Sequence, residues 1–403
     1  GMDAVAVESG LHIEPAIAGS FHWQGNTLAF TPTADWPTGA VRVSLRGAIG
    51  ANGLPVLFES RWEFTVGAPR IAFLLRTGDA ANIWTVPVTG GEPTQITTER
   101  FGVDRFAISA DGTGFVFAAL RADGGADLKR SGRDGDGVTG VLECPSQRCT
   151  APAFSPDGNL IAFERHPLER LEQSTVEVID LRDGRRTTLD GDPAHIARFP
   201  TFARNGRLAY LNAFEQVIVV HDLASGATNR IANTSGEIGS WSPDGQYFVF
   251  AEITTAPPPT PASGTPAPDL QIDTFFSHLQ RISVNTDLGE NLSGESAVED
   301  AAPAFSPFGE WLAFGRKSLE QDKWTPGRQL WLMRSDGSDA QALTNDPLYN
   351  HSHFVWSPDG KLIVYVRFDV SDPASTTEIW SVSANGAGAM KLVTGGYLPA
   401  WLP

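Results

Sequence analysis

Two histidines at alternate positions, His351 and His353, are the residues best spaced for metal chemistry. They stand just ahead of an apolar segment that predicts a strand. If the strand extends back to them, both imidazoles lie on one face, because side chains two residues apart in a strand point the same way. A catalytic zinc site uses three protein ligands, so an isolated pair that binds no metal is the alternative.

A second candidate is the acidic segment Arg133-Asp134-Gly-Asp136-Gly137. Asp134 and Asp136 have the Asp-x-Asp-Gly spacing of calcium loops, but no glutamate follows at the twelfth position, which excludes an EF-hand. Asp-Gly also marks ordinary turns, so an acidic turn without metal is the alternative. We expect no cofactor, with calcium at Asp134 and Asp136 as the alternative.

The only cysteines, Cys144 and Cys149, bracket the segment Cys-Pro-Ser-Gln-Arg-Cys. Their spacing is too wide for Cys-x-x-Cys redox chemistry, and no second pair completes a zinc site. Two free thiols or one loop-closing disulfide remain, and we favour the disulfide, which would place the protein in an oxidising compartment.

Composition and missing motifs exclude several functions. The sequence has no Gly-x-Ser-x-Gly elbow with an α/β scaffold around it, no His-Glu-x-x-His and no phosphate-binding loop. We therefore expect a protein that is not an enzyme, and a peptidase least of all. With 30 basic and 47 acidic residues the net charge is −17, which disfavours nucleic acid as a partner. No apolar run reaches the ~20 residues of a membrane span.

A repeated signature shows which elements must position these residues. Copies stand at 154–158 (Phe-Ser-Pro-Asp-Gly), 241–245, 305–309 and 356–360, with weaker copies at 108–112 and 202–206. An alternating apolar run follows each copy. Pro presets φ, Asp bonds its own backbone and Gly accepts a positive φ, so each copy predicts a strand, a tight turn and a second strand. Third and fourth strands follow, a pattern typical of β-propeller blades.

Counting these repeats predicts an all-β, seven-bladed β-propeller over residues 69–403. Six repeats are complete, while 70–97 supply three strands and 397–403 the missing first strand of the seventh. Pairing of the chain ends would then close the ring and remove its exposed sheet edges. The proline-rich stretch 253–270 predicts an excursion from one blade. Five alternating runs within residues 1–68 predict a small β-sandwich.

Over 70–403 the repeats resemble the TolB-like propeller family, through the Ser-Pro-Asp-Gly signature followed by segments such as Ile-Ala-Phe. The resemblance implies a bacterial extracytoplasmic protein, either periplasmic, secreted or attached to the cell surface; the sequence contains no signal peptide. Residues 1–68 resemble the bacterial Ig-like domains of S-layer and surface proteins, in Met2-Asp3, Phe30-Thr-Pro32 and Trp62-Glu-Phe-Thr-Val-Gly67. That domain would be partial, because its opening strands are missing.

The innermost strands of a propeller surround its axial channel, so residues that enter them line the channel mouth. The candidates at this mouth are Asp104, Arg198, Glu237, Asp300, His351, His353 and Tyr397. They form either a solvated polar rim or a mixed-charge pocket. We expect a monomeric binding or scaffold protein whose mouth holds a protein or peptide of the cell envelope, or a small polar ligand. The alternative is a metal-dependent polysaccharide lyase, because the related oligogalacturonate lyases hold a metal with propeller histidines.

Overall fold

The computed structural model describes residues 3–403, except 25–26, 34–35, 51, 56–58, 191, 193, 257–273, 287 and 295–296. The chain divides into two compact units: Gly1–Pro69 with Pro403, and Arg70–Leu402. In the part described, no helix is long and apolar enough to cross a membrane.

The N-terminal unit contains the helix α1 (Ala4–Gly10) and strands in two sheets. One sheet has the order β1 (Leu11–Glu14), β4 (Gly39–Leu45), β5 (Ser60–Val66); the other pairs β2 (Gly19–Gln24) with β3 (Thr27–Pro32). Trp36 joins the sheets, because its ring contacts Phe30 of β3 and Phe64 of β5. The sequence did not predict α1. Asp3 caps the N-terminus of this helix, because its carboxylate accepts a hydrogen bond from the Ala6 N–H at 2.9 Å.

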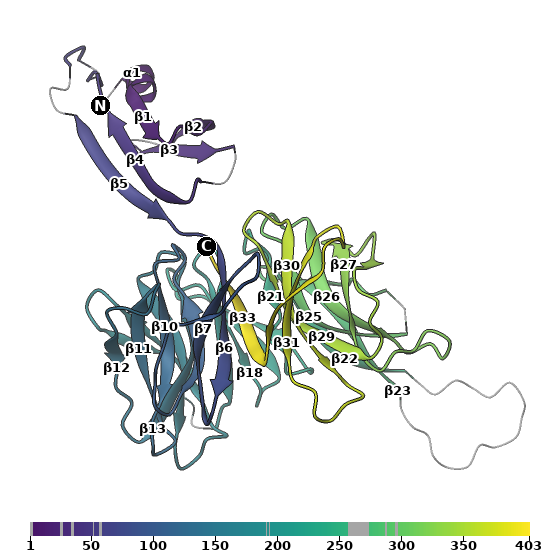
Figure 1. Cartoon of the computed structure of the whole chain (residues 1–403). Helices are drawn as coiled ribbons and strands as arrows, with labels where there is room; N and C mark the ends of the chain where they lie inside the picture. The colour runs from purple at the N-terminus through teal and green to yellow at the C-terminus, as the bar shows by residue number, and fades with distance from the viewer. Residues whose placement is uncertain are drawn as a thin grey trace, which may run out of the picture. The chain divides into compact units, whose positions relative to one another are not determined.

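The second unit repeats one pattern of four antiparallel strands (Figure 1). The groups are β33 (Gly396–Leu402), β6 (Arg70–Thr77), β7 (Ala80–Pro87), β8 (Thr94–Gln95); β9 (Val103–Ile108), β10 (Gly114–Leu120), β11 (Ala126–Gly132), β12 (Thr139–Leu142); β13 (Gln147–Phe154), β14 (Leu160–Pro167), β15 (Thr175–Asp180), β16 (Arg186–Thr188); and β17 (Ala197–Phe202), β18 (Leu208–Asn212), β19 (Val217–His221), β20 (Thr228–Ala232).

The remaining groups follow in chain order. They are β21 (Ser240–Trp241), β22 (Tyr247–Ala256), β23 (Thr274–Ser283), β24 (Gly289–Asn291); β25 (Val298–Phe305), β26 (Trp311–Ser318), β27 (Gln329–Arg334), β28 (Gln341–Ala342); and β29 (Tyr349–Trp356), β30 (Leu362–Asp369), β31 (Glu378–Ser383), β32 (Met390–Thr394). Single parallel pairs, Ala126↔Arg148 and Ser277↔Glu299, join groups into eight-stranded sheets. The predicted excursion 253–270 begins inside β22, which runs to Ala256, and the rest of it lies outside the described residues.

Strands from the two ends of this unit lie side by side. Figure 1 shows β33, in yellow, beside β6, in blue, and the two pair antiparallel from Gly396↔Leu75 to Leu402↔Arg70. The core lies between neighbouring sheets. Leu74 of β6 packs in one cluster with Phe117 of β10, while Phe73 packs in another with Val366 of β30. Each face of the β6 sheet is therefore buried by a different neighbour, as stacked blades require.

The Ser-x-Asp-Gly turns share one hydrogen-bond pattern. In the turn after β13, the Ser155 hydroxyl donates to Asp157 at 2.5 Å and accepts the Leu160 N–H at 2.9 Å, and Asp157 also accepts the Asn159 N–H at 3.1 Å. Gly158 closes the turn at φ +71°, a conformation that favours glycine. The same bonds recur around Ser109, Ser242 and Ser357.

A β-bulge interrupts the first strand of most groups. In five of these strands, one residue of the bulge has a left-handed backbone, with φ between +47° and +56°. These residues are Ala151, Phe199, Ala302, His353 and Leu398. The strand register shifts across each of them. Pro152, Pro200, Pro303 and Pro399 follow four of these residues directly. Proline cannot donate to the ladder, so inside a sheet it is tolerated at bulges, and these prolines explain where the strands bend.

Candidate functional site

The bulged strands surround a cavity of about 520 Å³, here called the mouth cavity. Its polar lining comes from β6, β9, β13, β29 and β33 and the adjoining loops: Arg76, Asp79, Asp104, Arg105, Arg148, Ser352, His353, Thr377 and Tyr397. A smaller cavity of about 240 Å³ shares Asp104, Arg105 and Arg148, and adds Glu164, His166 and Arg198 among others. The structure thus places Asp104, Arg198, His353 and Tyr397, of the predicted mouth residues, around adjoining cavities.

Asp104 and Arg105 occupy the bulge of β9, where the register shifts between Phe117 and Ala119 of β10. The two side chains differ in their partners. Asp104 receives a hydrogen bond from the Thr150 hydroxyl and pairs with Arg148, whose Nη2 lies 2.6 Å from Oδ1. Arg105 has neither an ion pair nor a hydrogen bond with any described residue. None of its five N–H donors therefore has a partner in the described part of the chain.

Arg198 is a second arginine whose guanidinium has N–H donors without a partner in the described part of the chain. Its Nη2 makes a long hydrogen bond, 3.4 Å, to the backbone oxygen of Glu172. Its Nε is buried and has no hydrogen-bond partner in the described part of the chain. Glu164, in the same smaller cavity, is not available to Arg198, because it accepts the Phe199 N–H at 2.7 Å and bonds His166 Nε2 at 2.8 Å.

The charge of Arg105 influences two neighbours in the mouth cavity. The pKa of His353 is lowered, first by loss of solvent around the imidazole and then by the positive charge of Arg105. The pKa of Tyr397 is raised, chiefly by burial, with Arg76 and Arg105 opposing that shift and Asp104 adding to it. His353 and Tyr397 are therefore neutral near pH 7, and the arginines carry the positive charge of the cavity.

Asp300 has a role that the sequence did not reveal. It was expected at the mouth, but it is 0% exposed. Arg316 donates two hydrogen bonds to its carboxylate, at 2.7 and 2.6 Å, and the Ser293 hydroxyl a third at 2.5 Å. The position two residues before each left-handed residue is buried in every such strand, as at Cys149 and Ala197. Asp300 is therefore an internal ion-pair partner and not a ligand-binding group.

His351 occupies the same buried position in β29 and is 1% exposed. Its Nδ1 donates to the Arg328 backbone oxygen at 2.8 Å, and its ring packs on Tyr365. His353 instead has φ +53° and lines the mouth cavity. The expected shared face is absent because this left-handed residue breaks the strand alternation between the two histidines. Glu237, the remaining candidate, is exposed and makes a 3.5 Å contact with the Ala302 N–H.

The other sequence candidates lie elsewhere in the second unit. Cys144 and Cys149 form a disulfide, with both side chains buried beside β10 and β14. Asp136 closes a turn, its backbone oxygen accepting the Gly132 N–H at 2.8 Å. Among the described residues, no group of three or more His, Cys, Asp or Glu side chains is placed to hold a metal ion.

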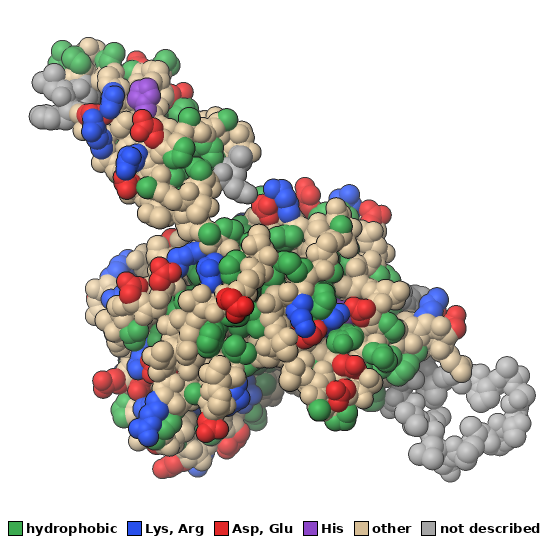
Figure 2. All heavy atoms as spheres, in the orientation of Figure 1, with side chains coloured by type: hydrophobic (Ala, Val, Ile, Leu, Met, Phe, Trp, Pro, Cys, Tyr) green, Lys and Arg blue, Asp and Glu red, His purple; other side chains and the backbone are tan. Residues whose placement is uncertain are grey.

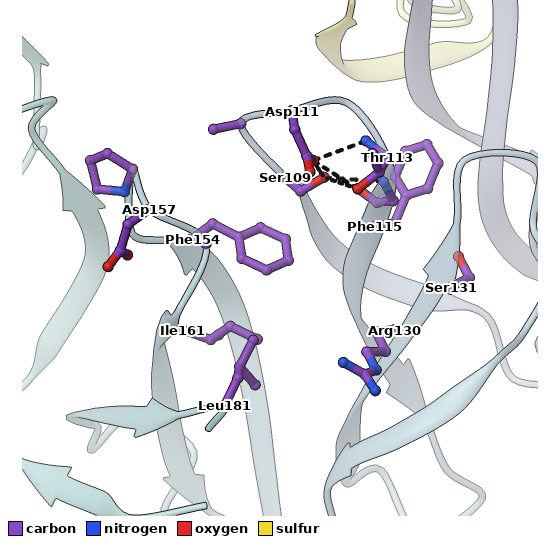
Figure 3. A pocket seen from close by; sticks show the side chains of 14 residues that line it. Ser109, Asp111, Thr113, Phe115, Arg130, Ser131, Phe154, Asp157, Ile161 and Leu181 are labelled. Atoms are coloured by element: carbon purple, nitrogen blue, oxygen red, sulfur yellow. Dashed lines mark hydrogen bonds between the residues drawn. The ribbon is translucent and has the colours of Figure 1, made fainter. Parts of the chain in front are cut away.

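A third cavity, of about 350 Å³, lies between two neighbouring Ser-x-Asp-Gly turns and is here called the turn cavity (Figure 3). Figure 3 shows Asp111 bonded to Ser109 and Thr113 on one side, with Phe154, Ile161 and Leu181 on the other. The carboxylates of Asp111 and Asp157 are occupied by their own turns. Repeat geometry therefore accounts for the two aspartates of this cavity, whereas the Ser131 hydroxyl, which also lines it, is buried without a hydrogen-bond partner in the described part of the chain.

Arg105, Arg76 and Arg148 are mouth residues that sequence analysis missed. A partial signal was available, because Pro152, Pro200 and Pro303 stand two residues before the signatures at 154, 202 and 305, and proline inside a strand marks a bulge. The strand that carries Arg105 has no such proline. On the face shown in Figure 2, basic and acidic side chains lie interspersed, so no broad basic area is present there.

Comparison with known proteins supports the fold. TolB from Acinetobacter baumannii is 13% identical, over 98% of this chain and 83% of that chain, with a TM-score of 0.50. A prolyl endopeptidase is 12% identical, over 83% of this chain and 50% of its own, with a TM-score of 0.53. An oligogalacturonate lyase from Vibrio parahaemolyticus is 13% identical, over 72% and 74%, with a TM-score of 0.46. The chain is thus all-β and resembles TolB-type β-propeller proteins. No protein-family profile and no curated protein sequence matches it.

Proposed function

We propose that the Arg70–Leu402 unit is a seven-bladed propeller closed by the β33–β6 pairing, and that the N-terminal unit is an Ig-like domain. The repeated groups of four antiparallel strands support the blade count. The two sheets of the N-terminal unit, joined by Trp36, support a sandwich. Closure of the ring by this pairing is favoured because it removes sheet edges that would otherwise be exposed.

Within this framework the protein is a non-catalytic, monomeric binding or scaffold protein of the bacterial cell envelope, acting outside the cytoplasm. Its ligand is a protein, a peptide or a small polar molecule held at the propeller mouth. The Cys144–Cys149 disulfide supports an oxidising compartment. The likeness to TolB is consistent with that location.

One observation carries the binding role: Arg105 lines a cavity of about 520 Å³ and has no partner among the described residues. Cavities of that size hold small ligands or a few residues of a peptide. A guanidinium that is partly withdrawn from water gains most from a partner that brings charge or hydrogen-bond acceptors. The described part of the fold supplies none to Arg105, and we infer that the partner comes from outside the chain.

The test is a calorimetric screen of envelope peptides and acidic oligosaccharides against the wild type, Arg105→Ala and the control Arg130→Ala. Arg130 lines the turn cavity, away from the mouth residues. A mouth ligand should lose about tenfold or more in affinity with Arg105→Ala and keep its affinity with Arg130→Ala. Equal affinity in all three proteins would contradict a site at the mouth. Turnover of an oligosaccharide that chelation abolishes would instead support a metal-dependent lyase.

A further inference from the structure

The lining of the mouth cavity is partly polar and partly apolar. Its apolar part, here called the apolar wall, consists of Phe101, Val103, Leu120, Val366, Phe368 and Leu398. Phe101 is 43% exposed although it is a large apolar side chain. A ligand that is polar on every side, such as an oligosaccharide of charged sugars, would leave this wall without a partner. An apolar group against the wall would gain the free energy of removing both surfaces from water.

The charges of the lining favour an anion. Three arginines and two aspartates line the mouth cavity, an excess of one positive charge in a protein of net charge −17. Arg148 is neutralised by Asp104 at 2.6 Å, and Arg76 donates to the backbone oxygen of Asp79 at 2.6 Å. Arg76 therefore keeps its charge, because a backbone oxygen is neutral, but of the three arginines it is Arg105 that has neither an ion pair nor a hydrogen bond in the described chain. One unit of charge matches a carboxylate better than a doubly charged phosphate ester, and a guanidinium binds a carboxylate through two parallel hydrogen bonds.

We propose that the mouth cavity binds an amphipathic monoanion, with its single carboxylate on Arg105 and its apolar body on the wall that contains Phe101. This inference rests on the proposed function and specifies its ligand class. Tyr397 lines the same cavity and offers a neutral hydroxyl and a flat ring. Two sources share this chemistry: the last residue of a peptide with an apolar C-terminus, and a free small carboxylic acid.

Titration calorimetry with four probes tests the proposal: N-acetyl-Ala-Ala-Phe, its C-terminal amide, N-acetyl-Ala-Ala-Glu and N-acetyl-phenylalanine. We expect the Phe acid to bind the wild type about tenfold or more tightly than its amide, since amidation removes the charge that Arg105 recognises. We expect it also to bind more tightly than the Glu peptide, which cannot use the apolar wall. Arg105→Ala should abolish the difference between acid and amide, and Arg130→Ala should preserve it.

The probes also distinguish the two sources. Binding of N-acetyl-phenylalanine as tight as that of the peptide indicates a free acid, whereas binding about tenfold weaker indicates a peptide C-terminus. The proposal is wrong if the amide binds as well as the acid, if the difference survives in Arg105→Ala, or if no acid binds. Should another ligand then prove sensitive to Arg105→Ala, the proposed function stands without this ligand class. If no ligand distinguishes Arg105→Ala from Arg130→Ala, the proposed function itself fails.

Discussion

The mouth cavity and the turn cavity are both formed by the repeated strands, but the aspartates of the turn cavity and Arg105 of the mouth cavity differ in their partners. In the turn cavity, Asp111 and Asp157 accept hydrogen bonds from the serine and backbone groups of their own turns. In the mouth cavity, Arg105 has no partner in the described chain. Polar groups that already have partners stabilise the fold, whereas donors without a partner are available to a ligand. We therefore expect Asp111 and Asp157 to be structural and Arg105 to bind a ligand, while the Ser131 hydroxyl is a partnerless group in the described lining of the turn cavity.

We expect the largest change in stability from replacing Asp300, a buried carboxylate that accepts three hydrogen bonds. Asp300→Ala should lower the free energy of unfolding by about 3–5 kcal/mol, because it leaves Arg316 without its buried partner. Denaturation in urea measures the change. Glu320→Ala is the control, since its ion pair with Lys323 is exposed to solvent and should contribute far less to stability. Equal losses in the two variants would contradict the assignment of Asp300 to the interior.

One of the turns lacks the aspartate that accepts hydrogen bonds in the others. Phe308 replaces the usual aspartate in the turn after β25 and is 71% exposed, while Ser306 still accepts the Trp311 N–H at 3.1 Å. Phe308→Asp should restore the missing hydrogen bonds and stabilise the protein by about 1 kcal/mol. Asp359→Ala, which removes them from the turn after β29, should destabilise it by a similar amount. Urea midpoints that move in the same direction would contradict this account.

The buried position of His351 predicts a dependence on pH. Burial lowers its pKa below the ordinary value of 6.5. Below pH 6.5 the unfolded chain binds a proton that the folded chain does not, so stability falls with decreasing pH, by at most about 1.4 kcal/mol per pH unit for one proton. His351→Gln should flatten this slope between pH 7 and the lowered pKa. Some slope should remain, because the pKa values of His221 and His353 are lowered too. Parallel curves for variant and wild type would show that His351 is not the buried neutral group.

The smallest effect on stability is expected at the proposed ligand-binding residue. Arg105→Ala removes no hydrogen bond or ion pair within the described chain, so the free energy of unfolding should change by less than about 0.5 kcal/mol. Arg148→Ala should cost more, because it leaves Asp104 without its ion-pair partner. Thermal or urea denaturation of both variants shows which of them loses more stability. A larger loss for Arg105→Ala would mean that Arg105 supports the fold.

The sequence predicted the repeated elements because their signals are local. The Ser-x-Asp-Gly turns contain their own hydrogen bonds, and all five predicted strands of the N-terminal unit are present. The six-residue segment from Cys144 to Cys149 likewise requires only a local turn to form its disulfide. Such features depend on neighbouring residues and can be identified without the rest of the fold.

Most of the candidate site could not be predicted in this way. Whether Asp300 faces the mouth or the interior depends on a bulge that shifts the register two residues later, and on Arg316 of the next strand. The pairing of Asp104 with Arg148, which leaves Arg105 without a partner, joins strands of different groups. The side-chain direction of His353 depends on a left-handed backbone that strand alternation does not predict.

A crystal structure of the protein with bound N-acetyl-Ala-Ala-Phe, or with the tightest ligand from the screen, tests the central claim most directly. Both cavities are present in the same crystal, so each serves as the control for the other. The account predicts ligand density in the mouth cavity, with the carboxylate in contact with Arg105 and the apolar group against Phe101. Density in the turn cavity beside Arg130, with the mouth cavity unchanged, would contradict it.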